Sequence, residues 1–144
     1  MASRREEVLE AVKSLLALTL PAAKVERNAA KPERIPAGGL VIVRDGDPGD
    51  PEVILSPLTY LYTHRIPVEV AVVAAPALSR EQVLDETLRA IGAAVEADRT
   101  LGGLCDFVEP EAPATDDIEA TGTVAGRWAD AVIVAIYATT NPLT

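Results

Sequence analysis

The fold is decided by residues 79–109, SREQVLDETLRAIGAAVEADRTLGGLCDFVE, which we expect to form one amphipathic helix followed by a sharp turn. Ser79 and Gln82 have the spacing of a capping box, which satisfies free N–H groups at the start of a helix. Apolar residues then recur at steps of three and four as far as Val95, so one face of the helix is apolar. The glycine pair at 102–103 supplies the backbone freedom that a helix end commonly needs. A helix with one apolar face needs a partner, which the rest of the chain must provide.

The composition predicts a single domain, residues 1–144, with an aliphatic core. Apolar residues make up 49% of the chain but aromatic residues only 3%, which disfavours nucleic-acid binding by base stacking. The net charge of −9 also disfavours binding to phosphate backbones. Residues 1–44 hold eight of the thirteen Lys and Arg residues against five acids, a net of +3, so residues 45–144 carry −12. This asymmetry indicates either ordinary solubilising charge or a surface that orients one subunit against another.

The cysteine count and the hydropathy pattern predict a soluble intracellular protein without membrane contacts. Cys105 is the only cysteine, which excludes an internal disulfide and fits a reducing, cytosolic compartment. No apolar run approaches the roughly 20 residues that a membrane span requires. The first residues, MASRREE, contain acids and begin an amphipathic pattern, so they do not have the character of a signal peptide.

The remaining residues predict a second helix and several strands. Ser3 and Glu6 form another capping-box pair, and apolar residues follow at helical spacing until Pro21, which predicts a helix over residues 4–18. Residues 22–36 interleave basic residues with Ala, Asn and Pro, and we expect an extended, partly mobile connector with a short strand at 23–27. Strands are expected at 39–44, 52–55, 58–75 and 128–139, with a turn at 45–51, a proline-bearing loop at 109–113 and an interruption at 125–127.

The alternation of residues 58–75 places Tyr62, His64 and Ile66 on one mainly apolar face and the charged residues on the other. Because Pro67 cannot donate to a ladder, an edge position or a bulge is expected near it. The strand at 39–44 is expected to form an antiparallel hairpin with this run across the turn at 45–51. Together the elements predict an α+β fold: an antiparallel or mixed sheet of about four strands, with two helices packed on one face in two layers. The far sheet face would stay open, which indicates an oligomer.

The sequence offers few groups for catalysis. His64 is the only histidine, and Cys105 is followed by an aspartate that would raise its pKa, so we interpret Cys105 as a small buried hydrophobe. The Asp-rich turn at 45–51 departs from a calcium loop, because Pro48 takes the fourth position and Ser56 the twelfth. The chain contains no P-loop, nucleophile-elbow or dinucleotide motif. We therefore expect no enzyme activity, no cofactor and no metal site.

The order of the elements and one short motif resemble a known family. The main helix ends in DRTLGGLC (98–105), the charged strand HRIPVEV (64–70) lies upstream, and the chain finishes with AVIVAIYAT (131–139). An Arg/Glu-rich helix and a β-hairpin come first, and an acidic, proline-bearing linker precedes the last strand. Over nearly its whole length the chain is thus similar to the tail terminator (minor tail protein) family of long-tailed phages and related gene transfer particles.

The resemblance implies a non-enzymatic α+β protein that assembles in the bacterial cytoplasm as a hexameric ring on the head-proximal end of a tail tube. Such proteins end tube polymerisation, so the implied partners are further copies of the chain, the tail tube protein and a head-completion or connector protein. DNA would pass through the lumen only as cargo, and a net acidic body fits a lumen that repels phosphates. The candidate subunit or tube contacts are residues of the connector and the turn: Arg27, Lys31, Arg34, Asp45, Asp47 and Asp50.

Two other functions remain open from the sequence. One is a head–tail connector or stopper of the same particle, which shares the size and the acidity. The other is a small cytosolic enzyme acting on an acyl or other small-molecule substrate, with His64 or Cys105 at its centre.

Overall fold

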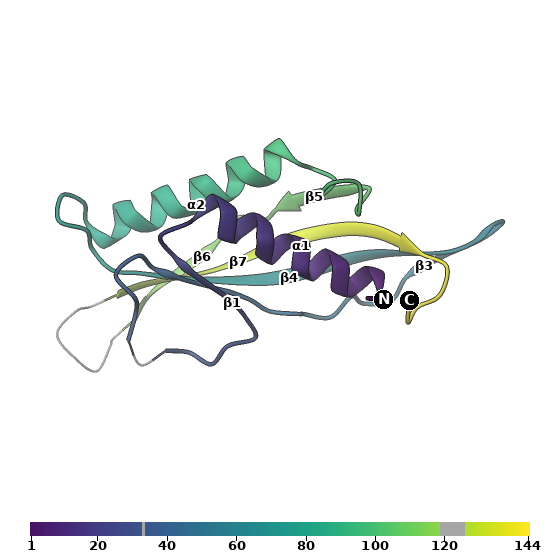
Figure 1. The fold of residues 1–144 in the computed structure, drawn as a ribbon, viewed down its shortest axis with the longest axis horizontal. Coiled ribbons are helices and arrows are strands. Elements are labelled where there is room, and N and C mark those ends of the chain that lie inside the picture. Colours follow the sequence, from purple (N-terminus) through teal and green to yellow (C-terminus); the bar gives the residue numbers. More distant parts are fainter. Residues whose placement is uncertain (33, 119–125) are drawn as a thin grey trace.

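In the computed structural model, which describes residues 1–32, 34–118 and 126–144, two helices pack on one face of a mixed sheet (Figure 1). The predicted α+β class and the placement of both helices on one face are confirmed. The sheet has seven strands, five of them in its main order, so the expectation of about four strands was wrong. The elements are α1 (Arg4–Thr19), β1 (Lys24–Arg27), β2 (Leu40–Val43), β3 (Glu52–Leu55), β4 (Leu58–Val72), α2 (Arg80–Ala97), β5 (Phe107–Pro110), β6 (Ala114–Ile118) and β7 (Gly126–Thr139).

Two long antiparallel strands, β4 and β7, form the centre of the sheet. They pair without a register change from Tyr60 opposite Thr139 to Val72 opposite Arg127. Both β2 and β3 pair with the other edge of β4, and β5 and β6 pair with the other edge of β7. The outermost strand, β1, runs parallel to β2, which makes the sheet mixed. The expected antiparallel pairing of residues 39–44 with the long run is confirmed, but the two do not form a hairpin across the turn at 45–51, because β3 lies between them and is itself the hairpin partner of β4.

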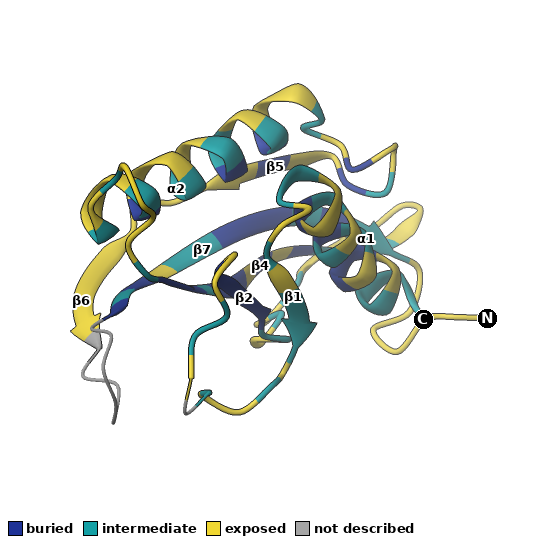
Figure 2. Cartoon of the chain, turned by 60° about the vertical axis from the view of Figure 1, so that its left-hand side comes forward, coloured by how far each residue is buried: buried dark blue, intermediate teal, exposed yellow. Residues whose placement is uncertain are grey.

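The core lies between the helices and the sheet face that the alternation of β4 predicts. The even-numbered residues of β4 from Tyr62 to Val72 are buried beneath the helices, as Figure 2 shows for the central strands. Both helices bury an aliphatic face against them, at about 1.5–3 kcal/mol for each large aliphatic side chain. The helical residues are Val8, Leu9, Val12 and Leu16 of α1 and Leu84, Ile91 and Val95 of α2.

The helix starts follow the sequence closely. The capping box of α2 is complete, since Ser79 accepts from the backbone of Gln82 and the Gln82 side chain accepts from the backbone of Ser79. At α1 only half of the expected box forms. Ser3 Oγ accepts from the Glu6 N–H at 3.2 Å, but the Glu6 carboxylate accepts from Arg27 of β1. A charged partner thus replaces the local contact.

A bulge lies opposite Pro67, where the sequence predicts an edge or a bulge. Between the pairs Val43–Val68 and Asp47–Arg65, three residues of the β2 side face two residues of β4. The extra residue therefore belongs to the neighbouring chain segment and not to β4. Gly46 has a φ of +63° there, and a Cβ atom on it would lie 2.6 Å from the carbonyl oxygen of Arg65. This close approach requires glycine.

The segment expected as an acidic linker and loop contributes both of the unpredicted strands, β5 and β6. Three residues at 111–113 face two residues of β7, so β5 and β6 form one edge strand interrupted by a second bulge. Prolines and acids are tolerated here because the outer edge of the strand needs no ladder partner. The expected interruption at 125–127 is wrong for Gly126 and Arg127, because both belong to β7 and pair with β6. Residues 119–125, including Ala125 of the expected interruption, lie outside the described residues.

The far face of the sheet is open only in part. In the connector, the short strand expected at 23–27 exists as β1, and Ala29 and Ile35 pack against a small cluster on the far face. That cluster consists of Leu40, Ile42, Ala71 and Trp128. The connector is therefore an extended chain that covers one end of the far face. This contact is favourable because it removes the apolar side chains of the cluster from water.

Candidate assembly surfaces

The β3–β4 hairpin presents aliphatic side chains to solvent. Leu55 is 81% exposed, and Val53, Ile54 and Leu58 are 43–48% exposed. Leu55 pairs with Leu58 across the turn, and directly opposite residues of an antiparallel pair share one face of the sheet. That face is the one that the helices cover farther along β4. In Figure 1 the hairpin reaches beyond the helical layer, and among residues 1–32, 34–118 and 126–144 nothing covers its apolar face.

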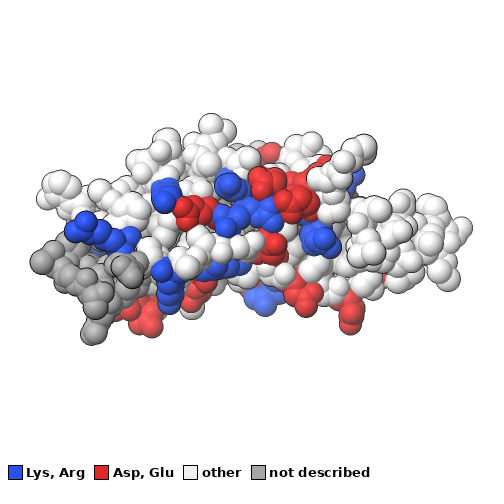
Figure 3. All heavy atoms as spheres, turned by 60° about the horizontal axis from the view of Figure 1, so that its bottom comes forward, with Lys and Arg blue, Asp and Glu red and all other residues white. Residues whose placement is uncertain are grey.

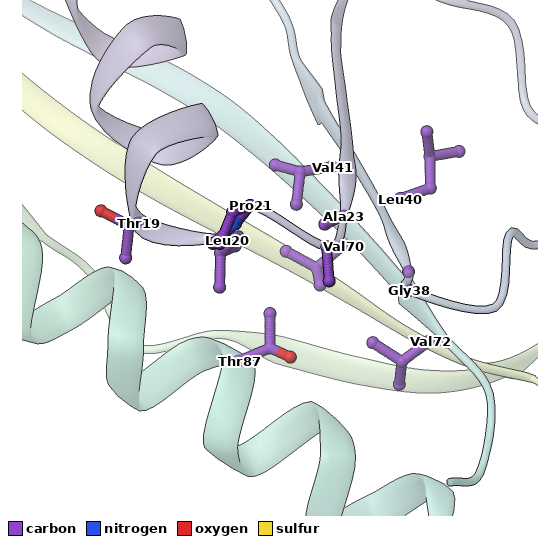
Figure 4. A pocket seen from close by; sticks show the side chains of 12 residues that line it. Thr19, Leu20, Pro21, Ala23, Gly38, Leu40, Val41, Val70, Val72 and Thr87 are labelled. Atoms are coloured by element: carbon purple, nitrogen blue, oxygen red, sulfur yellow. The ribbon is translucent and has the colours of Figure 1, made fainter.

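An apolar pocket lies at the opposite end of β4. It opens where α1 ends, the chain crosses to β1, and α2 passes above the last residues of β4 (Figure 4). The cavity has a volume of about 180 Å³. All of its lining residues are uncharged, and only the threonines 19 and 87 bring polar side chains. Leu20, Val41, Val70 and Val72 supply most of the apolar wall.

Two of the candidate contact residues from the sequence meet within the chain. The Arg27 guanidinium donates to Asp45 at 2.7 Å and also pairs with Glu6 and Glu10 of α1. This arrangement ties α1, β1 and the loop after β2 together. The hydrogen bonds from Arg27 lower the pKa of Glu6 and of Asp45, because each bond stabilises the ionised carboxylate.

The other four candidates lie apart. Lys31 places its Nζ 4.5 Å from the centroid of the Trp128 ring, a cation–π contact on the far face. Arg34 is exposed in the connector. Asp47 and Asp50 are exposed in the loop between β2 and β3, where Asp47 accepts from the backbone of Gly49 at 2.9 Å. As Figure 3 shows, Lys and Arg on the face turned forward are interspersed with Asp and Glu, so the described residues form no single-sign patch there.

His64 is fully buried and uses both ring nitrogens in hydrogen bonds. Its Nε2 lies 2.7 Å from the backbone oxygen of Asp45, which only accepts, so Nε2 carries the proton. The Nδ1 of the neutral ring then accepts from the Tyr137 hydroxyl at 2.9 Å. Burial lowers the pKa of His64, and it raises the pKa of Tyr137 to about 12. The ring joins β4, β7 and the loop after β2.

Cys105 is buried, as the sequence predicts. Burial raises the pKa of the Cys105 thiol to about 11, so the thiol stays protonated at pH 7. Within residues 1–32, 34–118 and 126–144, no three His, Cys, Asp or Glu side chains gather as a metal site requires. No helix in that part of the chain is both long and apolar enough to span a membrane.

Sequence reasoning missed both apolar surfaces, for different reasons. The hairpin has a local signal, VILSPL at 53–58, in which aliphatic residues flank Ser-Pro without the polar alternation of an exposed strand. The pocket has no such signal, because its walls come from α1, β1, β2, β4, α2 and the segments between them. No protein-family model matches this chain, and no curated protein matches it closely enough to count as a relative.

Proposed function

We propose that this chain is a tail terminator: a subunit that forms a ring, six-membered by family resemblance, at the head-proximal end of a phage-type tail tube. It would end polymerisation of the tube and join the tail to head-completion proteins. The support from the sequence is the resemblance in element order and in the motif at 98–105. The observation that carries the proposal is the exposed apolar β3–β4 hairpin.

The hairpin supports an assembly function because exposed aliphatic side chains gathered on one projecting element are unfavourable in water. Its exposed aliphatic residues lie within six positions, 53–58. Contiguous apolar surface of this kind is characteristic of protein–protein contact sites. A subunit that must bind both its own copies and a tube needs such surface outside its core.

The charge supports passage of DNA through the ring. Residues 45–144 carry a net charge of −12, and the edge strand β5–β6 exposes Glu109 and Asp116 beside Glu111 and Asp117, which are paired with arginines. Carboxylates that line a lumen repel phosphate groups, so DNA would slide past without binding. A ring whose lumen is neutral or basic would contradict this part of the proposal.

The environments of the two candidate catalytic groups, His64 and Cys105, favour a structural role in assembly over an enzymatic function. Both nitrogens of His64 are engaged by Asp45 and Tyr137 inside the core, where the ring cannot reach a substrate. The protonated thiol of Cys105 is a weak nucleophile at pH 7. Each group has a structural explanation that requires no substrate.

Electron microscopy of particles from cells that lack this chain tests the proposal. Overlong tails would support termination, and restoration of normal length by the chain supplied from a plasmid would assign the defect to this protein. Tails of normal length that fail to join heads would favour a connector or stopper. Normal, joined tails would end both proposals.

A further inference from the structure

The two apolar surfaces lie at opposite ends of one strand. The hairpin tip, residues 55–58, stands at the start of β4, and Val70 and Val72 in the pocket stand at its end. A strand of this length spans about 45 Å at roughly 3.3 Å per residue. Within one copy, therefore, the tip cannot reach the pocket, and a contact between the two surfaces must join two copies.

We propose that the hairpin tip of one copy, with Leu55 foremost, enters the apolar pocket of a second copy. The sizes agree: the cavity of about 180 Å³ slightly exceeds an apolar cavity of about 150 Å³ that holds benzene, so it admits a branched aliphatic side chain. The polarities agree as well, because residues 53–59 and all of the pocket-lining residues are uncharged.

The surroundings of the pocket favour a protein occupant over a small molecule. Pro21 and Ala22, which line the pocket, are exposed, and so is Ala37 next to the lining residue Gly38. A hairpin that inserts Leu55 into the cavity would lay Val53 and Leu58 on this apolar rim. The rim and the cavity would thereby be covered together, which a ligand confined to the cavity would not achieve.

The contact joins unlike surfaces, so every copy offers one hairpin and one pocket. Such head-to-tail contacts produce a closed ring when the rotation closes, and otherwise a filament. One hairpin tip covers less than the roughly 800 Å² per partner of a stable interface, so an isolated pair should separate readily. The contact itself does not depend on the proposed function; only its role in a ring on a tail tube rests on that function.

Disulfide trapping in the purified full-length chain tests the contact, because it captures pairs that separate quickly. All variants carry Cys105→Ala to remove the native thiol. Copies with Leu55→Cys are mixed with copies with Thr87→Cys that bear a size tag, under mild oxidation. The expected product is the mixed dimer, well above the dimers of either variant alone. A single chain with both changes should give a ladder of linked oligomers.

Two further variants keep the test decisive. Ala93→Cys replaces Thr87→Cys as the matched control. Ala93 also lies in the interior of α2, but it is exposed and does not line the pocket. In a Leu58→Cys copy, the added change Leu55→Ser should reduce mixed dimers with Thr87→Cys about tenfold or more, because serine cannot replace the apolar burial of Leu55 in the pocket. Leu55 is exposed in the free subunit, so this change should leave the fold intact.

Three results would overturn the inference: no mixed dimer at millimolar protein, equal linking to Ala93→Cys, or preferential linking of Leu55→Cys to itself. The tail-length test separates this failure from failure of the proposed function. Overlong tails without hairpin–pocket linking would end only the inference. If the hairpin and pocket link but particles that lack the chain have normal tails, only the proposed terminator function would be refuted.

Discussion

At the scale of single residues, buried polar groups explain how the ends of distant segments are fixed. His64 donates to the backbone of Asp45 and accepts from Tyr137, and the carboxylate of the same Asp45 accepts from Arg27. The loop after β2 is therefore held from two sides, by the core and by the ion pairs of α1. His64 and Arg27 are largely buried, so leaving either without partners is costly, and each has a testable effect on stability.

Stability should fall as the pH drops below about 6.5, the ordinary pKa of histidine in an unfolded chain. Burial lowers the pKa of folded His64, so between these two pKa values the unfolded chain binds a proton that the folded chain does not. The free energy of unfolding should decrease by up to about 1.4 kcal/mol per pH unit until the folded-state pKa is passed. Urea unfolding at pH 7.5 and 5.5 measures this change.

His64→Gln serves as the control for this linkage. It should lower stability at pH 7.5 but flatten the dependence between pH 7.5 and 5.5, because the titrating group is gone. The lowered pKa values of Glu6 and Asp45 place their own losses at more acidic pH. An equally steep dependence in His64→Gln would contradict the assignment.

Replacement of Arg27 by Met should destabilise the fold by about 2 kcal/mol or more, the scale of hydrogen bonds to charged groups. The Arg27 side chain is only 15% exposed, and its removal leaves Glu6, Glu10 and Asp45 near one another without a cation. Arg65→Met is the matched control, since the Arg65–Glu111 pair lies in water and its loss should barely move the unfolding midpoint. Equal effects of the two changes would show that burial does not set the cost.

At the scale of elements, the turn after α2 and the loop after β2 both place glycines at positive φ, a conformation that other residues rarely adopt. The turn after α2 places Gly102 at a φ of +69° and Gly103 at +94°. A Cβ atom on Gly103 would meet nothing within 4 Å, so the requirement there is conformational and not steric. At Gly46 the reason is the opposite, because the backbone of β4 leaves no room.

Gly103→Val should therefore cost about 1–3 kcal/mol through backbone strain alone and lower the thermal midpoint before any effect on assembly. Gly92→Ala is the informative comparison within the same helix. Gly92 has an ordinary helical conformation and free space, so alanine there should stabilise the protein by about 0.5–1 kcal/mol. Unchanged stability in Gly103→Val would refute this account of the turn.

At the scale of the whole molecule, the helical layer is shorter than the sheet. The apolar stripe of β4 runs from Leu58 to Val72, but the buried part begins at Tyr62. The uncovered remainder lies on the hairpin, and the gap where α1 ends and α2 passes above β4 is the pocket. Both features follow from how long the layers are relative to each other.

The pair of changes Leu55→Asp and Leu58→Asp should reproduce overlong tails without weakening the fold, if the proposed function holds. Both side chains are exposed, so charge there costs the monomer little but must be desolvated in an assembled contact. Leu143→Asp is the control, because Leu143 is 80% exposed outside the hairpin. Tail lengths by electron microscopy and thermal midpoints should separate the two variants; normal tails in the double variant would contradict the use of the hairpin.

The local elements were largely predictable because their causes are local. Capping residues, a periodicity of three and four, and β-branched runs predict α1, α2, β2 and the long strands within a few residues of their bounds. The strands β5 and β6 were not predictable from residues 107–118, where prolines and acids oppose a strand. They form because β7 offers them an unpaired edge, which is a property of the assembled sheet.

The candidate site divides in the same way. The sequence by itself determined the α+β class, the face of β4 that is buried and the mid-strand place of His64, since side-chain alternation and helix periodicity need no knowledge of distant residues. Only the tertiary structure decided that Arg27 and Asp45 pair within the chain, that the hairpin outruns the helices, and that the pocket opens at the far end of β4. Each of these depends on segments that meet only after folding, and on which apolar surface remains once the layers are packed.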